Sequence, residues 1–251
     1  MCKENAVFDS VTIFVLASNE IVSLKKTIEK IKENCKEQEL DKIIIVLKSE
    51  TCPSFSVAQE LVGENSKVEL YIQKAATAAE CLAELPPMAE SSHFIIMASD
   101  LEMNPDNIKE FIAGAKKHPG RIICAAKWLD GSVINGYGKV HGFCSRAMNT
   151  FISLLYKKDI KDPFSVYQIY PVSVYRKMNF SDPSAFLYEY TLKPLRMGVE
   201  YEEIPTVYNK RKEEKTNFGL ITLVKVAVRF CLTAVKIRFT PMRYLNENKQ
   251  C

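Results

Sequence analysis

The first half of the chain alternates apolar runs with amphipathic segments. Residues 11–20, VTIFVLASNE, open with a β-branched apolar run and close on small and polar residues, which predicts a buried strand followed by a turn. The next segment places Leu24, Ile28 and Ile31 on one face at helical spacing. A strand, a turn and a helix are therefore expected to begin the fold.

This arrangement repeats as far as residue 105. The predicted elements are, in order, a strand and turn at 41–54, a helix at 55–65, a strand at 68–74, a helix at 75–90 and a strand at 93–99. We expect the first of these helices to stop at Gly63 and the second to break at Pro86 and Pro87. A further helix is expected to begin at Asn104 and Pro105.

The second half is less regular. The predicted elements are a strand at 121–128, a glycine-rich loop, a helix at about 144–156, a turn, strand and helix after Asp162, a helix at 188–196, a strand at 200–208, a charged loop and a long apolar helix from Gly219. Apolar strands joined by helices predict an α/β fold with a mostly parallel sheet covered on both faces. Ligands bind beyond the carboxyl ends of such strands, so functional residues are expected there.

Composition narrows the functional classes. The 251 residues are 47% hydrophobic, which suits one large domain with or without a short appendage. The net charge of +4 is too mild for a nucleic-acid signature, and we expect no nucleic-acid partner. The start MCKENAVFDS lacks the apolar core of a secretory signal, which predicts a cytoplasmic protein. The eight cysteines and three histidines do not have the spacing of a structural zinc site.

Two acids follow the strand predicted at 93–99. Asp100 and Glu102 lie two residues apart just past its end, a spacing that lets both carboxylates face one cation. Oxygen ligands suit Mg²⁺ or Mn²⁺, which take one or two carboxylates and complete their shell with phosphate and water. The alternative is that the acids only favour the dipole of the following helix. This short spacing leaves both interpretations open.

Several motifs along residues 11–240 resemble, in order and spacing, those of family 2 glycosyltransferases with the GT-A fold. They are most similar to the dolichyl-phosphate mannose synthase-like branch. The matching positions are Asn19 and Glu20, the stretch IIMASDLEMNP, Ser145, Arg146 and Asn149, Asp162 and Ser165, Glu189, Glu203 and Pro205, and Arg211. The resemblance implies a Rossmann-like, mostly parallel sheet with helices on both faces and a C-terminal amphipathic helix.

The resemblance also implies transfer of a sugar from a UDP- or GDP-linked donor. The residues expected at the nucleotide sugar are Asn19, Glu20, Lys48, Ser99 and Asp100. Asp100 and Glu102 are expected to hold Mg²⁺ or Mn²⁺ on the donor diphosphate. Negative charge builds up on that diphosphate as the sugar leaves, and a divalent cation stabilises it.

The implied reaction is an inverting displacement, in which an acceptor oxygen attacks the anomeric carbon as the nucleotide leaves. Asp162 or Glu189 is the candidate general base for a saccharide acceptor, whereas a lipid phosphate is already anionic and needs none. Arg211, on a charged loop, is expected to stabilise the leaving diphosphate. The residues expected to bind acceptor or phosphate are Arg146, Gln168 and Lys210.

Each of these residues also has a purely structural interpretation. Asp162 fits a turn before a proline, Glu189 fits a satisfied carboxylate on a helix, and Arg146 fits a side chain reaching from an apolar helix to water. The charged loop that includes Lys210 and Arg211 fits a solvated run of charges. The sequence leaves these alternatives open.

Departures from the family pattern bear on activity. Leu47 and Lys48 stand where the second strand usually ends in two aspartates. The metal motif D-x-D aligns with Ala98-Ser99-Asp100, so its first aspartate is missing and Glu102 is the expected substitute. Gln168 replaces a usual cation. A second hypothesis is therefore a degenerate GT-A domain that binds a nucleotide sugar, a lipid or a partner enzyme without turnover.

The last predicted helix has a basic edge. In GLITLVKVAVRFCLTAVKIRF, Lys225, Arg229 and Lys236 fall within about a 40° sector at about 100° per residue, and most other positions are apolar. This pattern predicts a helix lying on a membrane surface, with packing against the domain or a partner as the alternative. We expect a catalytic domain at 1–218, a membrane-associating helix and tail at 219–251, and a peripheral location on the cytosolic face of a membrane.

Overall fold

The computed structural model describes residues 6–180, 182–210 and 220–246, and the side chains of 220–224 are outside the description. Its first half confirms the predicted alternation of strands and helices. The elements are β1 (Val11–Ala17), α1 (Val22–Asn34), β2 (Leu40–Leu47), α2 (Phe55–Glu64), β3 (Val68–Ile72), α3 (Ala78–Glu84), the short 3₁₀ helix η1 (Pro86–Met88) and β4 (His93–Ala98). Pro86 and Pro87 end α3 as predicted, by starting η1.

The second half adds shorter strands and longer helices. Its elements are α4 (Asn107–Lys117), β5 (Ile122–Ala126), β6 (Val133–Asn135), α5 (Lys139–Tyr156), β7 (Gln168–Pro171), α6 (Val172–Tyr175), η2 (Pro183–Ala185), α7 (Phe186–Arg196), β8 (Tyr201–Pro205), β9 (Val207–Asn209), α8 (Leu220–Phe239) and α9 (Met242–Leu245). All lie within the described ranges.

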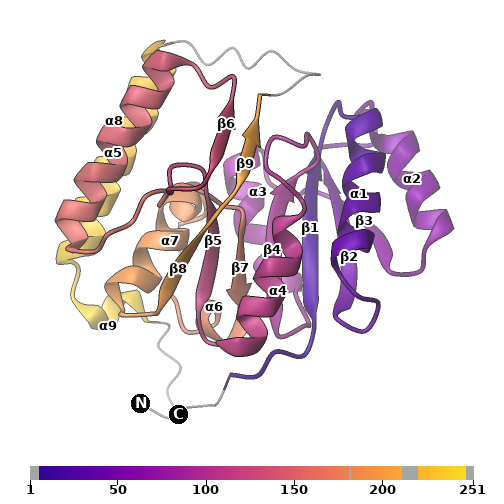
Figure 1. Cartoon of the computed structure of the whole chain (residues 1–251), viewed down its shortest axis with the longest axis horizontal. Coiled ribbons are helices and arrows are strands. Elements are labelled where there is room, and N and C mark those ends of the chain that lie inside the picture. Colours follow the sequence, from indigo (N-terminus) through magenta and orange to yellow (C-terminus); the bar gives the residue numbers. More distant parts are fainter. Residues whose placement is uncertain (1–5, 181, 211–219, 247–251) are drawn as a thin grey trace.

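One seven-stranded sheet forms the centre, in the order β3-β2-β1-β4-β7-β5-β8. Only β7 runs antiparallel to its neighbours, which confirms the mostly parallel sheet. A second, two-stranded sheet joins β6 and β9 (Figure 1). The carboxyl ends of the parallel strands therefore meet at one edge, which we name the carboxyl edge.

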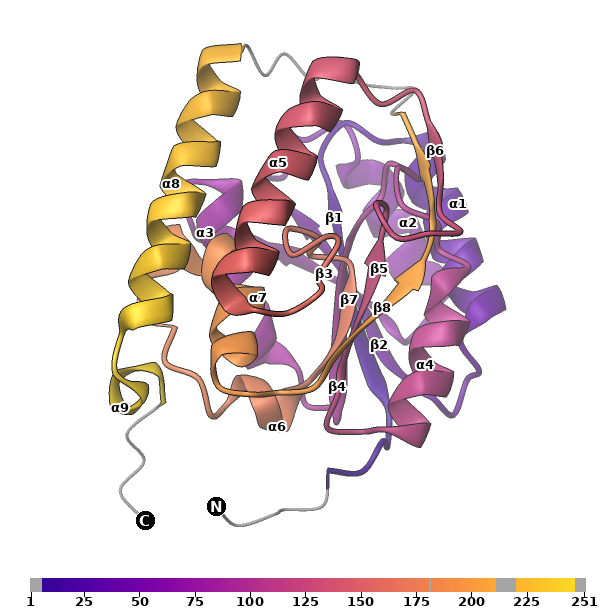
Figure 2. The same cartoon turned by 60° about the vertical axis from the view of Figure 1, so that its left-hand side comes forward.

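Helices cover both faces of the main sheet (Figures 1 and 2). One face packs under α1, α2 and α4 through a core that includes Ile28 and Phe111. The other face packs under α3 and α7 through Leu82 and Tyr190. Successive side chains of a strand point to opposite faces, so a strand covered on both sides is mostly apolar, as β4 is after His93.

Three predicted boundaries were wrong. The helix expected from Asn104 begins at Asn107, and the helix expected near residue 144 begins at Lys139, inside the predicted glycine-rich loop. The single strand expected at 200–208 divides at Thr206 into β8 and β9. Asn107 fixes this division, because its side-chain amide donates to the Pro205 carbonyl at 3.0 Å and accepts from the Thr206 hydroxyl at 2.6 Å.

Helix α8 packs beside α5 and α7 (Figure 2). Its inner side chains, among them Phe230, Ala234 and Ile237, join Ile152 and Leu192 in a third core cluster. The expected division between residues 218 and 219 lies outside the described residues, and it stays a prediction. In the described part of the chain, no helix has both the length and the apolar character needed to cross a membrane.

Candidate functional site

The end of β4 lies beside the turn that follows β1. The two strands pair in parallel with Leu16 opposite Ala98, and the Ser99 amide donates to the Leu16 carbonyl at 2.9 Å. Helix α1 secures the same point, because the Thr27 hydroxyl donates to the Ser99 carbonyl at 3.1 Å. The predicted nucleotide residue Asn19 and the predicted metal residue Asp100 are therefore brought to the same part of the carboxyl edge.

Residues Asp100, Leu101 and Glu102 form a tight turn, here called the acid turn. Leu101 has φ of +57°, in the left-handed region that costs an ordinary L-residue roughly 1–2 kcal/mol. The Glu102 amide donates to Oδ1 of Asp100 at 2.9 Å, which closes the turn. Backbone strain of this kind persists where the surroundings hold it in place, and it is found often at ligand sites.

The acid turn is held from the opposite side by β9. The Asn209 amide donates to the Glu102 carbonyl at 2.8 Å, and Met103 forms an antiparallel bridge with Tyr208. The Tyr208 hydroxyl donates to Oε1 of Glu102 at 2.5 Å. Sequence reasoning missed Tyr208, whose partner lies 106 positions away along the chain. Strand β9, which leads to Lys210, is therefore hydrogen-bonded to the predicted metal residue Glu102.

The donor set of the acid turn fits a divalent cation that shares its shell with a substrate. Mg²⁺ is commonly held by one or two carboxylates, with phosphate and water completing the coordination. Asp100 and Glu102 supply two carboxylates, and the hydrogen bond from the Tyr208 hydroxyl would orient one of them toward such an ion. Among the described residues, no group of three metal-binding acids, histidines or cysteines occurs.

Glu20 shapes the turn after β1. Its Oε2 accepts the backbone amides of Ser18 at 2.7 Å and Asn19 at 3.0 Å, and the side chain is buried. The Ser54 hydroxyl donates to the Glu20 carbonyl at 2.7 Å and ties the turn to the start of α2. Glu20 therefore positions Asn19, which is exposed.

The other predicted nucleotide residues differ in exposure. Lys48 is exposed at the end of β2, and Ala98 is exposed at the end of β4, where the family pattern has its first aspartate. Ser99 is fully buried, and its hydroxyl has no hydrogen-bond partner among the described residues. The Lys48 side chain is therefore accessible to a ligand. The buried Ser99 side chain is not, and Ser99 contributes only its backbone hydrogen bonds with Leu16 and Thr27.

Asp162 is fully buried in an ion pair with a lysine that sequence reasoning missed. Lys127 follows β5, and its Nζ lies 3.0 Å from Oδ2 of Asp162. Burial is the largest single influence and would lower the pKa of Lys127, but the Asp162 carboxylate together with Tyr137 and Cys124 outweighs it, so this pKa lies above its ordinary value. Lys127 therefore remains a cation beside the carboxyl edge. The only sequence signal was a lysine directly after a buried strand.

Glu203 supports this ion pair from behind. Its carboxylate accepts the Asp162 amide at 2.7 Å and the Lys161 amide at 2.8 Å. Burial raises the pKa of Glu203, although both backbone amides favour its ionised form. Asp162 is thus enclosed on both sides, and the geometry does not favour its predicted role as general base, which stays a prediction.

A row of aromatic rings connects the acid turn to α5. Tyr208 packs edge-on against Tyr137 with ring centroids 5.0 Å apart, and Tyr137 packs against Trp128 at 5.2 Å. The Arg146 guanidinium lies 4.7 Å from the Trp128 ring centroid, and Trp128 Nε1 donates to Ser145 Oγ at 3.0 Å. The row therefore links Arg146, which is exposed, to the acid turn through three aromatic side chains.

The remaining predicted residues lie apart or outside the description. Glu189 binds Lys193 at 2.7 Å on α7, and burial raises its pKa. Gln168 is fully buried in β7, where its Nε2 approaches Thr191 of α7 at 3.4 Å. The geometry therefore does not favour ligand contact by Gln168. Lys210 is exposed, with its amide bound to the Asn135 carbonyl, whereas Arg211 lies outside the described residues.

Comparison with known proteins agrees with this arrangement. The family model for glycosyl transferase family 2 matches residues 12–181, which contain the acid turn and the Lys127–Asp162 pair. The chain therefore belongs to glycosyl transferase family 2. A search of curated proteins finds no match. Membership of the dolichyl-phosphate mannose synthase-like branch stays a prediction.

The chain also resembles solved structures of glucosyl-3-phosphoglycerate synthase from Mycobacterium tuberculosis. The complex with Mn²⁺, UDP and phosphoglyceric acid superposes with a TM-score of 0.64 at 13% identity, over 93% of this chain and 80% of that one. The complex with Mg²⁺ and UDP (TM-score 0.63, 12% identity) matches over 93% of this chain and 80% of that one, and the complex with Mn²⁺, UDP-glucose and glycerol 3-phosphate (0.63, 13%) over 93% and 81%. At such identity the likeness shows the shared GT-A fold.

Proposed function

We propose that this protein is a divalent-metal-dependent hexosyltransferase that moves a sugar from a UDP- or GDP-linked donor to an acceptor with inversion. The observation that carries the proposal is the strained acid turn at the carboxyl edge, held by Tyr208 on one side and joined to the Asn19 turn on the other. Ligands of open α/β sheets bind at this edge. Related folds solved with UDP and Mn²⁺ or Mg²⁺ support the donor class.

Asp100 and Glu102 are the residues that would hold Mg²⁺ or Mn²⁺. Such an ion, when bound, neutralises charge that develops on the donor diphosphate. Asn19 and Lys48 are exposed at neighbouring strand ends and would contact the nucleotide. Lys210, which continues from β9, and Arg211 would supply further positive charge to the leaving diphosphate.

The acceptor that the geometry favours is one that is already anionic. Both candidate bases are engaged by lysines: Asp162 is enclosed with Lys127, and Glu189 is largely buried with Lys193. Neither carboxylate is presented to an acceptor hydroxyl. A phosphate oxygen can attack the anomeric carbon without a general base, and the Lys127 ammonium would help to attract it. We therefore favour a phosphate-bearing acceptor, with a lipid phosphate as the proposed case, over a saccharide.

Titration calorimetry of UDP and GDP tests the donor site. We expect one of the two nucleotides to bind the wild type with Mn²⁺, and binding to be lost with a chelator or in Asp100→Ala. Glu29→Ala is the control, since Glu29 is an exposed acid on α1, and it should bind as the wild type does. The absence of binding under every condition would refute a catalytic role.

The specific alternative is a binding domain without turnover. Ala98 is exposed where the family pattern has an acid, and Lys48 is exposed where it has another. The acid missing at Ala98 weakens cation binding, and the acids missing at Leu47 and Lys48 change the contacts available to the nucleotide. This alternative predicts nucleotide binding that is weak, independent of metal and unaffected by Asp100→Ala, so the same titration distinguishes it from the transferase.

A further inference from the structure

The outer face of α5 is apolar and uncovered. Val140, Phe143, Phe151 and Leu154 are exposed, and at about 100° per residue they fall within a sector of about 80°. Phe143 and Leu154 are 75% and 73% accessible to solvent. Large apolar side chains at this exposure, gathered along one helix, commonly mark an interaction surface.

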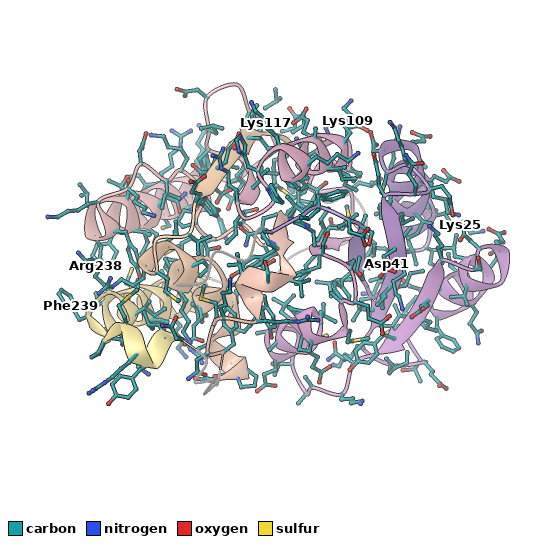
Figure 3. All side chains as sticks on the ribbon, turned by 90° about the horizontal axis from the view of Figure 1, so that it is seen from below. Lys25, Asp41, Lys109, Lys117, Arg238 and Phe239 are labelled. Carbon is teal, nitrogen blue, oxygen red and sulfur yellow. The ribbon has the colours of Figure 1, made fainter. Side chains whose placement is uncertain are left out.

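Helix α8 presents a second apolar stripe. Val228, Leu232, Val235 and Phe239 are exposed and lie within a sector of about 60°. Phe239 is 74% accessible and lies at the outer end of α8 (Figure 3). The opposite side of the helix is the buried one, so α8 has both a core face and a free apolar face. The buried face packs against the rest of the domain, whereas attachment of α8 to a membrane stays a prediction.

The two stripes form one surface. Helices α5 and α8 lie side by side and run in the same direction (Figure 2). The end of α5 is joined to the second half of α8, because the Tyr156 hydroxyl donates to the Ala234 carbonyl at 3.1 Å and Arg238 Nε donates to the Leu155 carbonyl at 3.0 Å. We name this surface the two-helix face. It consists of Val140, Phe143, Phe151, Leu154, Val228, Leu232, Val235 and Phe239.

Basic side chains border the two-helix face on both sides. Lys225, Arg229 and Lys236 are exposed along the edge of α8 away from α5, where Arg229 contacts Ser184 of η2. Lys139 and Arg146 are exposed along the other edge, where Arg146 lies over Trp128. Neither helix contains an aspartate or glutamate. The surface is therefore an apolar band between two positive margins.

We propose that the two-helix face docks on an anionic lipid bilayer surface, with its apolar band among the acyl chains and its basic margins at the headgroups. This combination is what amphipathic interfacial helices use. A second copy of the chain fits less well, because two such faces packed together would bring their positive margins close. The site goes beyond the proposed transfer reaction, since it involves neither the acid turn nor a donor.

Sedimentation with vesicles tests the docking surface without donor or metal. The probes are vesicles of phosphatidylcholine alone and of phosphatidylcholine with phosphatidylserine. We expect the wild type to sediment with the anionic vesicles, less with the neutral ones, and less again at high salt, which screens the basic margins. Phe143→Ser with Leu232→Ser should weaken binding by roughly tenfold or more, because both side chains would leave the acyl region.

Two matched controls distinguish binding through the two-helix face from nonspecific binding to vesicles. Val7→Ser removes an apolar side chain that is 69% exposed outside the two helices, and binding should not change. Lys225→Ala with Lys236→Ala should reduce binding to anionic vesicles by about fivefold for each lysine. Lys109→Ala with Lys117→Ala, on α4 away from α8, should have no such effect (Figure 3).

Two results would overturn the proposal. One is vesicle binding that is absent or does not depend on the face: either the wild type does not sediment with anionic vesicles, or the variant with Phe143→Ser and Leu232→Ser sediments as the wild type does. The other is a lipid-free dimer that these substitutions dissociate while vesicle binding is absent, which would assign the face to a second copy. Light scattering of the same samples measures the dimer. Nucleotide titration is independent of either result, so failure here leaves the transferase proposal standing.

Discussion

The Tyr208 hydroxyl lies 2.5 Å from Oε1 of Glu102. Strand β9, which lies outside the main sheet, is therefore hydrogen-bonded to the predicted metal site. Outer-shell hydrogen bonds of this kind orient a carboxylate before a metal arrives. The same contact makes the position of Lys210, two residues further on, depend on the acid turn. If the acid turn binds the donor as proposed, donor binding would therefore affect the position of Lys210.

Tyr208→Phe should lower Mn²⁺ affinity by about tenfold, because it removes the hydroxyl but keeps the ring against Tyr137. Titration of Mn²⁺ in the presence of UDP or GDP measures this. The matched control is Tyr71→Phe, since the Tyr71 hydroxyl donates to Glu84 at 3.0 Å away from the site, and it should leave affinity unchanged. Equal effects of the two variants would contradict a role for Tyr208 at the metal.

Lys127→Met should destabilise the protein by about 3 kcal/mol, because it leaves the Asp162 carboxylate buried without its partner. Urea unfolding at neutral pH measures the change. Lys25→Met is the control: its pair with Glu60 is exposed, and its loss should cost less than about 1 kcal/mol. A cost for Lys127→Met no greater than that of Lys25→Met would show that Asp162 does not depend on this lysine.

The difference in stability between wild type and Lys127→Met should also depend on pH, in a direction set by the pKa of Lys127. The pKa of Lys127 in the folded protein lies above its ordinary value of 10.5. Its contribution to stability is therefore complete below pH 10.5 and is lost as the pH rises through the folded value. The gap in stability between wild type and Lys127→Met should be constant near neutrality and narrow in strongly alkaline buffer.

Runs of apolar residues predicted the strands and the acids that follow them. A strand covered on both faces is apolar until it reaches the carboxyl edge of the sheet, where polar side chains can begin. Asp100 and Glu102 could be found in this way. Contacts between distant segments could not. The Tyr208–Glu102 bond spans 106 positions and exists only because the chain leaves the main sheet at Thr206. The Lys127–Asp162 pair likewise depends on how β5 meets the loop before β7.

The stripe on α5 shows a different limit of sequence reading. An apolar face at helical spacing normally predicts the side that packs on the core. In α5 the core side uses Asn149, Ile152 and Tyr156, whereas Phe143 and Leu154 are exposed. A helix that is apolar on both sides does not reveal which side is covered. Only the packing of α8 beside α5 distinguishes them.

Leu101→Gly should stabilise the protein by about 0.5–1 kcal/mol, because glycine adopts positive φ without the steric cost, although it loses more backbone entropy on folding. Lys157→Gly is the comparison, since Lys157 also has positive φ, at the end of α5, and it should shift stability in the same direction. Urea unfolding measures both. Destabilisation by Leu101→Gly alone would mean that the leucine side chain, rather than the turn, stabilises the site.

Gln168→Met separates a ligand role for Gln168 from a structural one. The side chain is fully buried, its Oε1 has no partner among the described residues, and its Nε2 reaches Thr191 only at 3.4 Å. Replacing a poorly satisfied amide with an apolar side chain of similar volume removes the cost of burying it. We expect stability to be unchanged or raised by about 1 kcal/mol, and nucleotide titration to match the wild type. A variant that folds normally but binds donor or acceptor more weakly would instead restore the ligand role that the sequence pattern suggested, and would require the interface between β7 and α7 to open on binding.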